Sequence, residues 1–165
     1  MNNIKIIEYE EKYLDDIRNL LVELEEYIVS IDKDNLDQVG KDYREKMALC
    51  DLKLVKENNG KTYLAILNNK VIGLIMGIEI KYSKEDYFDY KCPKKGSIIE
   101  LIVTKNFRTS GVGKVLMKKM EDYFLSIGCE YISIDVFGYN ENAINFYSKE
   151  GYHTRMLDMI KKINE

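Results

Sequence analysis

One stretch of the chain constrains the fold more than any other, because it joins a buried strand to a helix through a glycine turn. Residues 96–104 are apolar and β-branched, which is typical of a central strand. Residues 108–114 read RTSGVGK, and an amphipathic helix follows from about Gly111 to Ile127. Its apolar face is formed by Val115, Leu116, Met120, Phe124 and Ile127. A strand, a glycine turn and a helix in this order predict an α/β fold.

The glycine turn has the physical properties of an anion site. The first N–H groups of a helix have no partner within the helix, and the helix dipole adds partial positive charge there. Gly111 and Gly113 let the backbone approach a ligand closely, and Arg108 and Lys114 add positive charge. These features favour a phosphate or a pyrophosphate as the ligand.

Several motifs compete for this turn. A Walker loop requires G-x-x-x-x-G-K-[ST], and neither the glycine spacing nor the Ser/Thr is present. A dinucleotide-binding fingerprint requires a third glycine where the chain has Leu116. The pattern R-x-x-G-x-G is matched by Arg108, Gly111 and Gly113. An ordinary turn that uses two glycines to start a helix is the simplest alternative.

The rest of the chain supplies the remaining layers of an α/β domain. Strands are expected at residues 4–8, 62–67, 70–82, 131–136 and 153–161, and helices at 13–31, 42–50 and 140–150, the last capped by the Asn140 side chain. The order β-α-α-β-β-β-α-β-α-β predicts a mixed sheet with helices on both faces. Without a linker or a repeat, residues 1–165 are expected to form a single domain.

Composition excludes several classes of protein. Lys and Arg number 25 against 28 Asp and Glu, so the chain has no excess of positive charge for binding nucleic acid. The longest apolar stretch, Val71 to Ile78, is too short to span a membrane, and residues 1–9 do not resemble a signal peptide. Three scattered cysteines and one histidine argue against a metal site and fit a cytoplasmic location.

A second motif lies downstream of the glycine turn. Residues 139–152 read YNENAINFYSKEGY. This segment resembles N-x-x-A-x-x-[FL]-Y-x-x-x-G-[FY], a signature of the GNAT N-acetyltransferase superfamily. The R-x-x-G-x-G turn resembles the pyrophosphate motif of the same superfamily, and both stand in the expected order. The resemblance covers roughly residues 62–161 and implies the GNAT fold, with acetyl-coenzyme A as the acetyl donor.

The resemblance also implies which residues hold the donor. Backbone N–H groups from Arg108 through Thr109, Ser110, Gly111, Val112 and Gly113 to Lys114 are expected to bind the pyrophosphate. The pantetheine arm is expected along Leu101, Ile102 and Val103, where neighbouring strands of this fold separate. A backbone N–H near Leu101 or Ile102 would face the thioester carbonyl.

Glu100 is the candidate general base for removing a proton from the attacking amine. Strand alternation places Ile98, Glu100, Ile102 and Thr104 on one face. A carboxylate in so apolar a strand is unusual, and desolvation would raise its pKa towards the working range of a base. The alternative is an ion pair between Glu100 and a lysine such as Lys95 or Lys105.

Tyr147 is the candidate general acid, because it matches the family tyrosine that lies near the coenzyme sulfur. An ordinary tyrosine, with a pKa of about 10, is protonated at neutral pH and can donate to a thiolate. The alternative is that Tyr147 packs beside Phe146 in the core. Asn140 is expected to contact the coenzyme or to cap its helix. The donor's thioester is expected to lie between Glu100 and Tyr147.

The acetyl acceptor is less defined by the sequence. Acidic and aromatic residues occur in the first helices and in residues 83–95, the segments that usually wall the acceptor site of this family; they include Glu23, Glu25, Glu26, Asp32, Asp34, Asp37, Glu85, Asp86, Tyr87, Phe88, Asp89 and Tyr90. Such residues suit a cationic amine, such as a polyamine or an amino sugar, although a protein amine is also open. Alternatives are a coenzyme A sensor without turnover and a nucleotide-binding domain of another fold. A homodimer is also possible.

Overall fold

The computed structural model describes residues 4–163, and the chain divides into two compact units. The first unit is residues 1–135 and the second is residues 136–165. We describe each unit by itself. The expectation of a single domain over residues 1–165 stays a prediction.

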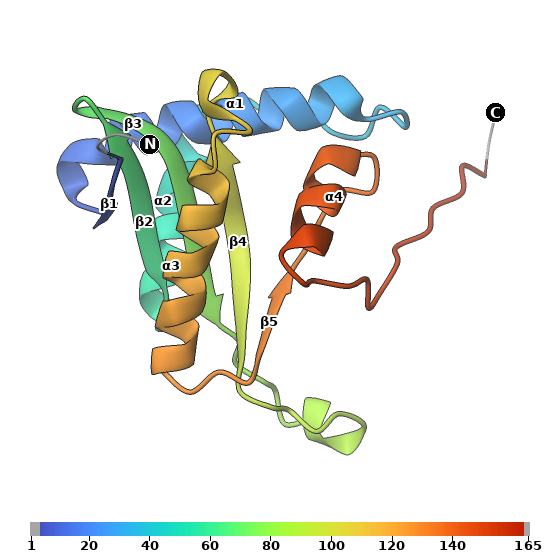
Figure 1. The fold of residues 1–165 in the computed structure, drawn as a ribbon. Coiled ribbons are helices and arrows are strands. Elements are labelled where there is room, and N and C mark those ends of the chain that lie inside the picture. The colour runs from blue at the N-terminus through green and yellow to red at the C-terminus, as the bar shows by residue number, and fades with distance from the viewer. Residues whose placement is uncertain (1–3, 164–165) are drawn as a thin grey trace. The chain divides into compact units, whose positions relative to one another are not determined.

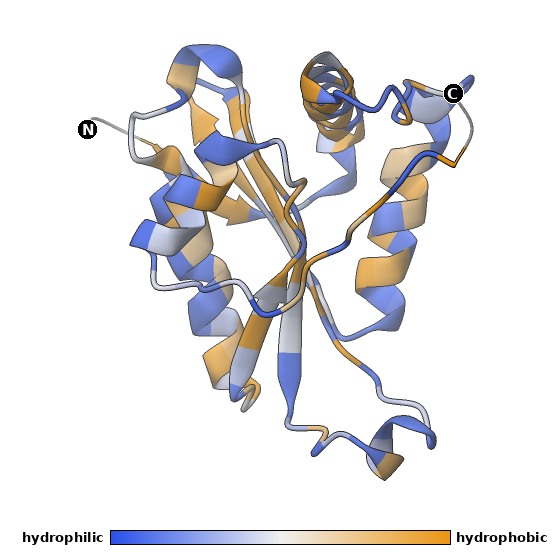
Figure 2. Cartoon of the chain, turned by 90° about the vertical axis from the view of Figure 1, so that its right-hand side faces the viewer, coloured by the Kyte–Doolittle hydropathy of each residue, from blue (hydrophilic) through white to orange (hydrophobic). Residues whose placement is uncertain are grey.

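A five-stranded sheet with the order β1-β2-β3-β4-β5 forms the centre of the first unit (Figure 1). Its strands are β1 (Lys5–Glu8), β2 (Lys61–Leu67), β3 (Lys70–Glu79), β4 (Lys95–Val103) and β5 (Tyr131–Ile134). The first four strands pair antiparallel, and β5 pairs parallel to β4. The expected mixed sheet is therefore confirmed in this unit. Figure 2 shows hydrophobic residues along much of the central strands.

Helices cover both faces of this sheet. The helices are α1 (Leu14–Ile31), α2 (Tyr43–Glu57) and α3 (Val112–Ser126), with a short 3-10 helix, η1 (Glu11–Tyr13), before α1. On one face, Ile17 and Leu21 of α1 pack with Leu74 and Met76 of β3 in a buried cluster. On the opposite face, a Cβ added at Gly77 would meet Phe124 and Met120 of α3. The sheet thus separates the α1–α2 layer from α3.

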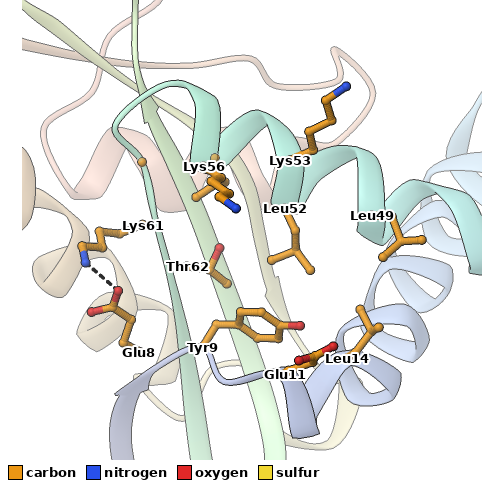
Figure 3. A pocket seen from close by; sticks show the side chains of 12 residues that line it. Glu8, Tyr9, Glu11, Leu14, Leu49, Leu52, Lys53, Lys56, Lys61 and Thr62 are labelled. Atoms are coloured by element: carbon orange, nitrogen blue, oxygen red, sulfur yellow. Dashed lines mark hydrogen bonds and ion pairs between the residues drawn. The ribbon is translucent and has the colours of Figure 1, made fainter.

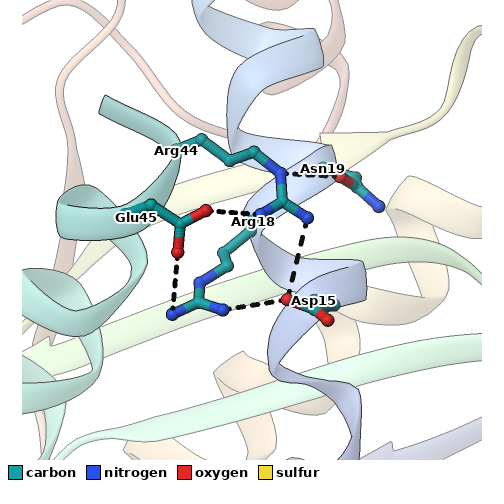
Figure 4. Close-up of polar contacts among 5 residues, drawn as sticks. All are labelled: Asp15, Arg18, Asn19, Arg44 and Glu45. Atoms are coloured by element: carbon teal, nitrogen blue, oxygen red, sulfur yellow. Dashed lines mark hydrogen bonds and ion pairs between the residues drawn. The ribbon is translucent and has the colours of Figure 1, made fainter. Parts of the chain in front are cut away.

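An ionic network holds α1 and α2 together (Figure 4). Arg18 contacts Asp15 at 2.9 Å and Glu45 at 3.2 Å. Arg44 contacts Glu45 at 2.6 Å and Asp15 at 3.7 Å, and its Nε donates to Asn19 at 3.3 Å. Shared partners lower the entropic cost of ordering each side chain, so this network fixes α2 on α1 more firmly than isolated surface pairs would.

Two element boundaries differ from the sequence expectation by three residues or more. Helix α2 continues to Glu57 instead of ending near Cys50, because Ala48, Asp51 and Val55 continue its buried face. Strand β3 ends at Glu79 rather than Tyr82, because β4 begins at Lys95 and its ladder with β3 ends at Glu79–Gly96.

The second unit contains α4 (Glu141–Lys149), which begins as the sequence predicts. The Asn140 side-chain oxygen accepts a hydrogen bond from the Ala143 N–H at 3.1 Å, so the expected N-cap is confirmed.

The expected final strand at residues 153–161 is wrong, since residues 152–163 adopt no helix or strand. Their apolar side chains occur as adjacent pairs instead of alternating, which does not suit one buried face of a sheet. They are also exposed, with Met156 and Leu157 each 80% accessible. The observed order over the described residues is therefore β-α-α-β-β-β-α-β-α, without a last strand.

Candidate active site

A bulge in β4 sets the direction of the Glu100 side chain. Met76 pairs with Glu100 but Gly77 pairs with Ile98, so Ile99 is an extra residue in β4. Paired residues share a face of the sheet, and therefore Ile98 follows Gly77 towards α3 whereas Glu100 follows Met76 towards α1 and α2. The expectation that Ile98 and Glu100 share a face is wrong, because the bulge breaks the alternation.

Glu100 is partly buried, and its carboxyl group has no ion pair or hydrogen bond among residues 4–163. The alternative of an ion pair with Lys95 or Lys105 is therefore wrong. Burial, together with the charges of Asp51 and Glu25, raises the pKa of Glu100 to about 8. A carboxyl group with this pKa is partly ionised at neutral pH and can accept a proton from an amine.

Two further carboxyl groups accompany Glu100, and we call Glu25, Asp51 and Glu100 the carboxylate cluster. Asp51 is 6% exposed, and its Oδ2 atom is buried without a hydrogen-bond partner. Burial raises the pKa of Asp51 to about 6. Burial also raises the pKa of Glu25, aided by the charge of Asp37. The Tyr43 hydroxyl donates to Glu25 at 3.4 Å, and this bond opposes that rise. These groups bring three acidic side chains together on the α1–α2 face, in surroundings that disfavour their charged forms.

The cluster sharpens the sequence expectation of an acidic acceptor wall. Among the acidic residues suggested there, Glu25 is one whose charge affects the pKa of Glu100. Asp51 was not among the residues suggested from the sequence. Its position between Ala48 and Val55, on the same helix face, would have indicated a buried carboxyl group. The loop aromatics Tyr87 and Phe88 are 65% and 88% exposed.

The glycine turn begins α3 with a backbone suited to an anion. Gly111 is the N-cap residue with φ 85°, and no side chain caps the helix. Thr109 also has a positive φ of 63°. The Thr109 hydroxyl donates to the Arg108 carbonyl at 2.6 Å and the Ser110 hydroxyl donates to the Phe107 carbonyl at 2.5 Å, so neither caps the helix. A helix start without a side-chain cap fits the expected pyrophosphate site.

Arg108 is held by α1. Its Nη2 lies 3.2 Å from Glu23 Oε1, its Nε donates to the Val103 carbonyl at 3.0 Å, and its guanidinium lies over the Tyr27 ring. Glu23 also accepts hydrogen bonds from the Thr104 hydroxyl and the Lys105 N–H, both at 2.8 Å. Glu23 therefore anchors the segment between β4 and α3, a role that the sequence did not indicate. Direct contact of Arg108 with phosphate stays a prediction.

The expected pantetheine strand has one unpaired edge in the first unit. Strand β5 pairs with β4 only from Lys95 to Ile98. Within residues 4–135, no strand pairs with the same edge of β4 from Ile99 to Val103, although the opposite edge pairs with β3. Leu101, Ile102 and Val103 lie in this stretch, and the separation of β4 from β5 agrees with the sequence expectation. An extended chain could add to this edge by backbone hydrogen bonds.

Tyr147 lies on the buried side of α4 in the second unit. It is 8% exposed, and its ring packs edge-on against Phe146 at 5.2 Å and Tyr152 at 6.0 Å between ring centroids. The aromatic packing that the sequence offered as an alternative is therefore present. Packing fixes the ring and leaves open a role for the hydroxyl, so donation by Tyr147 stays a prediction.

Comparison with known proteins gives the family. The family model described as "Acetyltransferase (GNAT) family" matches residues 15–152. The chain belongs to the GNAT acetyltransferase family. The match includes the carboxylate cluster, the R-x-x-G-x-G turn and the segment from Asn140 to Tyr152.

Individual relatives and solved structures agree with this assignment. An N-acetyltransferase of Methanocaldococcus jannaschii, described as uncharacterized, is 34% identical over 96 residues, which are 58% of this chain and 54% of that protein. The chain thus spans about half the length of this curated relative. A GNAT-family acetyltransferase from Staphylococcus aureus Mu50 is 20% identical with a TM-score of 0.66, covering 90% of this chain and 84% of that one.

An aminoglycoside acetyltransferase from an uncultured soil metagenomic sample, solved with sisomicin, shares the fold. It is 19% identical with a TM-score of 0.65, covering 99% of this chain and 98% of that one. At such identities the solved structures show a common fold. Among residues 4–163 no helix is long and apolar enough to cross a bilayer, and no group of His, Cys, Asp or Glu side chains is arranged to hold a metal ion.

Proposed function

We propose that the protein is an N-acetyltransferase that moves an acetyl group from acetyl-coenzyme A to a primary amine, with Glu100 as general base. The observation that carries this proposal is the partly buried Glu100 carboxyl group, which has no side-chain partner among residues 4–163 and whose pKa is raised to about 8. It lies beside a bulge in β4, and bulges are common next to active sites. Membership of the GNAT family supplies the reaction class.

Acetyl-coenzyme A, when bound, supplies an acetyl group activated as a thioester. The residues proposed to hold it are the backbone groups of Leu101 to Val103, along the unpaired edge of β4, and of Arg108 to Lys114, at the start of α3. The residues fit such a ligand, since the helix start has no side-chain cap and Gly111 has no Cβ to block an approaching phosphate. Asn140 is proposed to contribute from the second unit.

Glu100 would accept the proton that the attacking amine nitrogen loses as its bond to the acetyl carbon forms. Tyr147 would donate its hydroxyl proton to the sulfur as the carbon–sulfur bond breaks. One proton leaves the amine and one reaches the thiol, so the protons balance after solvent restores both residues. Burial and the charges of Asp51 and Glu25 keep the Glu100 carboxyl group a stronger base than an exposed glutamate.

The carboxylate cluster favours a cationic acceptor. Asp51 and Glu25 add negative charge near Glu100, and the buried Asp51 Oδ2 atom has no partner. A buried unpaired carboxylate is costly, and a second ammonium group on the acceptor would stabilise it. We therefore propose a small amine with more than one positive charge, of the polyamine or amino-sugar type. The aminoglycoside acetyltransferase that shares this fold has an acceptor of this class.

The test is thiol release from acetyl-coenzyme A over a panel of polyamines, aminoglycosides, apolar amines and peptides. The proposal predicts turnover with polycationic amines, and losses of about 100-fold or more in kcat for Glu100→Gln. Tyr147→Phe should lower kcat with little change in the affinity for acetyl-coenzyme A. Tight binding of acetyl-coenzyme A without turnover of any amine would contradict the enzyme and favour a sensor.

A further inference from the structure

A separate hollow of about 560 Å³ lies between η1, α2 and the start of β2, in the first unit (Figure 3). Its volume is that of a small-molecule site. Glu100, Asp51 and Glu25 do not line it. Thr62 of its lining pairs with Met76, which in turn pairs with Glu100, so the hollow begins two strands away from the proposed base, a distance of ~10 Å.

One part of this hollow is apolar. Leu14 of α1 and Leu49, Leu52 and Val55 of α2 line it, and Leu49 is 50% exposed. Figure 3 shows the Leu52 side chain directed towards the Tyr9 ring, with Leu49 and Leu14 at one side of the hollow. A ligand with an apolar body would remove this surface from water, which is favourable in proportion to the area covered.

The charged groups of the lining leave one ammonium and one carboxylate unpaired. Lys61 is paired with Glu8 at 2.5 Å. Lys53 is paired with Glu57 at 3.8 Å and extends away from the hollow in Figure 3. Within residues 4–163, Lys56 of α2 and Glu11 of η1 make no ion pair. These two opposite charges come from different walls of the hollow (Figure 3).

Two hydroxyl groups complete the lining. Thr62 is 4% exposed, and its Oγ1 atom is buried without a hydrogen-bond partner. The Tyr9 hydroxyl likewise makes no hydrogen bond among the described residues. Proteins rarely leave a buried hydroxyl unsatisfied, because the lost bond to water is not replaced. The Thr62 hydroxyl therefore points to a missing polar partner.

We propose that this hollow binds a zwitterion with an apolar body, the chemistry of a free apolar amino acid or a short apolar peptide. Lys56 would bind the ligand carboxylate and Glu11 its ammonium group. The hydroxyls of Tyr9 and Thr62 would satisfy remaining polar atoms, and Leu49 and Leu52 would cover the side chain. The site is additional to the proposed acetyl-transfer centre and does not depend on turnover.

The probes are leucine, leucyl-leucine, N-acetyl-leucine and leucinamide, titrated into the full chain and followed by methyl NMR and calorimetry. The proposal predicts saturable shifts at Leu49, Leu52 and Val55, with dissociation constants in the millimolar range or tighter. Removing either ligand charge should weaken binding at least about tenfold. Tighter binding of leucine assigns an amino acid, and tighter binding of the dipeptide assigns a peptide.

Matched variants locate the ligand. Lys56→Met should weaken leucine binding about tenfold while leaving leucinamide unchanged, and Lys53→Met on the same helix should change neither. Thr62→Val should raise the melting temperature without ligand but weaken leucine binding. Glu100→Gln should leave leucine affinity unchanged. Absence of saturable binding, equal binding of the charge-blocked analogues, or loss of binding in Glu100→Gln would overturn the proposal.

Discussion

Replacement of Glu100 by Gln should change how stability depends on pH. The folded protein holds the Glu100 proton more tightly than the unfolded chain does, because burial raises the pKa from its ordinary value of 4.5 to about 8. The stability contributed by the neutral carboxyl group is fully present below pH 4.5 and is lost as the pH rises through about 8. The unfolding free energy of the wild type should therefore fall over this pH range. Glu100→Gln should lack the part of this fall that comes from ionisation of Glu100.

The magnitude follows from the width of this range. Each pH unit between the two pKa values corresponds to ~1.4 kcal/mol, so at pH 7 burial of Glu100 costs the wild type roughly 3 kcal/mol relative to low pH. That is a large part of the 5–15 kcal/mol by which domains are typically stable, as a rough range. Glu100→Gln should be about as stable as the wild type near pH 4.5 and clearly more stable at pH 8.

The assay is urea unfolding at several pH values from 5 to about 9, with stability obtained by linear extrapolation. Glu26→Gln, which changes an exposed glutamate on α1, is the matched control and should follow the wild type. If the difference in unfolding free energy between Glu100→Gln and wild type stayed constant across this pH range, the carboxyl group would not be buried and unpaired as described.

Four further changes test other parts of the structure. Asp51→Asn should lower the pKa of Glu100, because the Asp51 charge raises it, and should move the acid limb of the pH–rate profile to lower pH. An acid limb that stayed at the same pH would show that the Asp51 charge does not act on Glu100. Glu23→Gln should raise the KM for acetyl-coenzyme A about tenfold, because Glu23 anchors Arg108 and the Lys105 N–H; an unchanged KM would remove Glu23 from donor binding. Gly60→Ala should destabilise the fold by ~2 kcal/mol or more in denaturant unfolding, because a Cβ there would lie 2.3 Å from the Gly77 carbonyl oxygen. The control Gly40→Ala should be close to neutral, because a Cβ at Gly40 meets no atom within 4 Å. Asn140→Ala should cost ~1 kcal/mol of local stability in α4, read from hydrogen exchange of the Ala143 amide, and unchanged protection would contradict the cap.

The sequence predicted the parts of the site that depend on local pattern. The strand, the glycine turn and the helix from residue 95 to residue 126 follow from β-branched residues, paired glycines and helical spacing, and all three are present. The Asn140 cap is equally local. Glu100 stood out because a carboxylate interrupts an apolar strand, and its burial agrees with that interpretation.

The parts that the sequence did not predict depend on tertiary pairing. The bulge at Ile99 comes from the register between β3 and β4 and reverses the face of Ile98, which alternation within one strand cannot indicate. The predicted end of α2 at Cys50 left Asp51 outside the helix. In the structure α2 continues to Glu57, and Asp51 lies on its buried face. The contact of Arg108 with Glu23 joins residues far apart in sequence.

The prediction of a last strand is wrong for a related reason. Strand propensity at residues 153–161 is no guarantee of a strand, because a strand also requires a neighbouring edge and one buried face. The described chain gives these residues neither, and Met156 and Leu157 remain exposed.

The most direct test of the central claim is the ratio of wild-type to Glu100→Gln kcat for acetyl transfer, measured from pH 5 to about 9 with one polycationic acceptor. Taking the ratio cancels the titration of the acceptor amine and isolates the group that was replaced. If Glu100 is the general base, the ratio should rise about tenfold per pH unit and level off above pH about 8, where its carboxyl group is ionised. A ratio that is independent of pH would contradict Glu100 as the base.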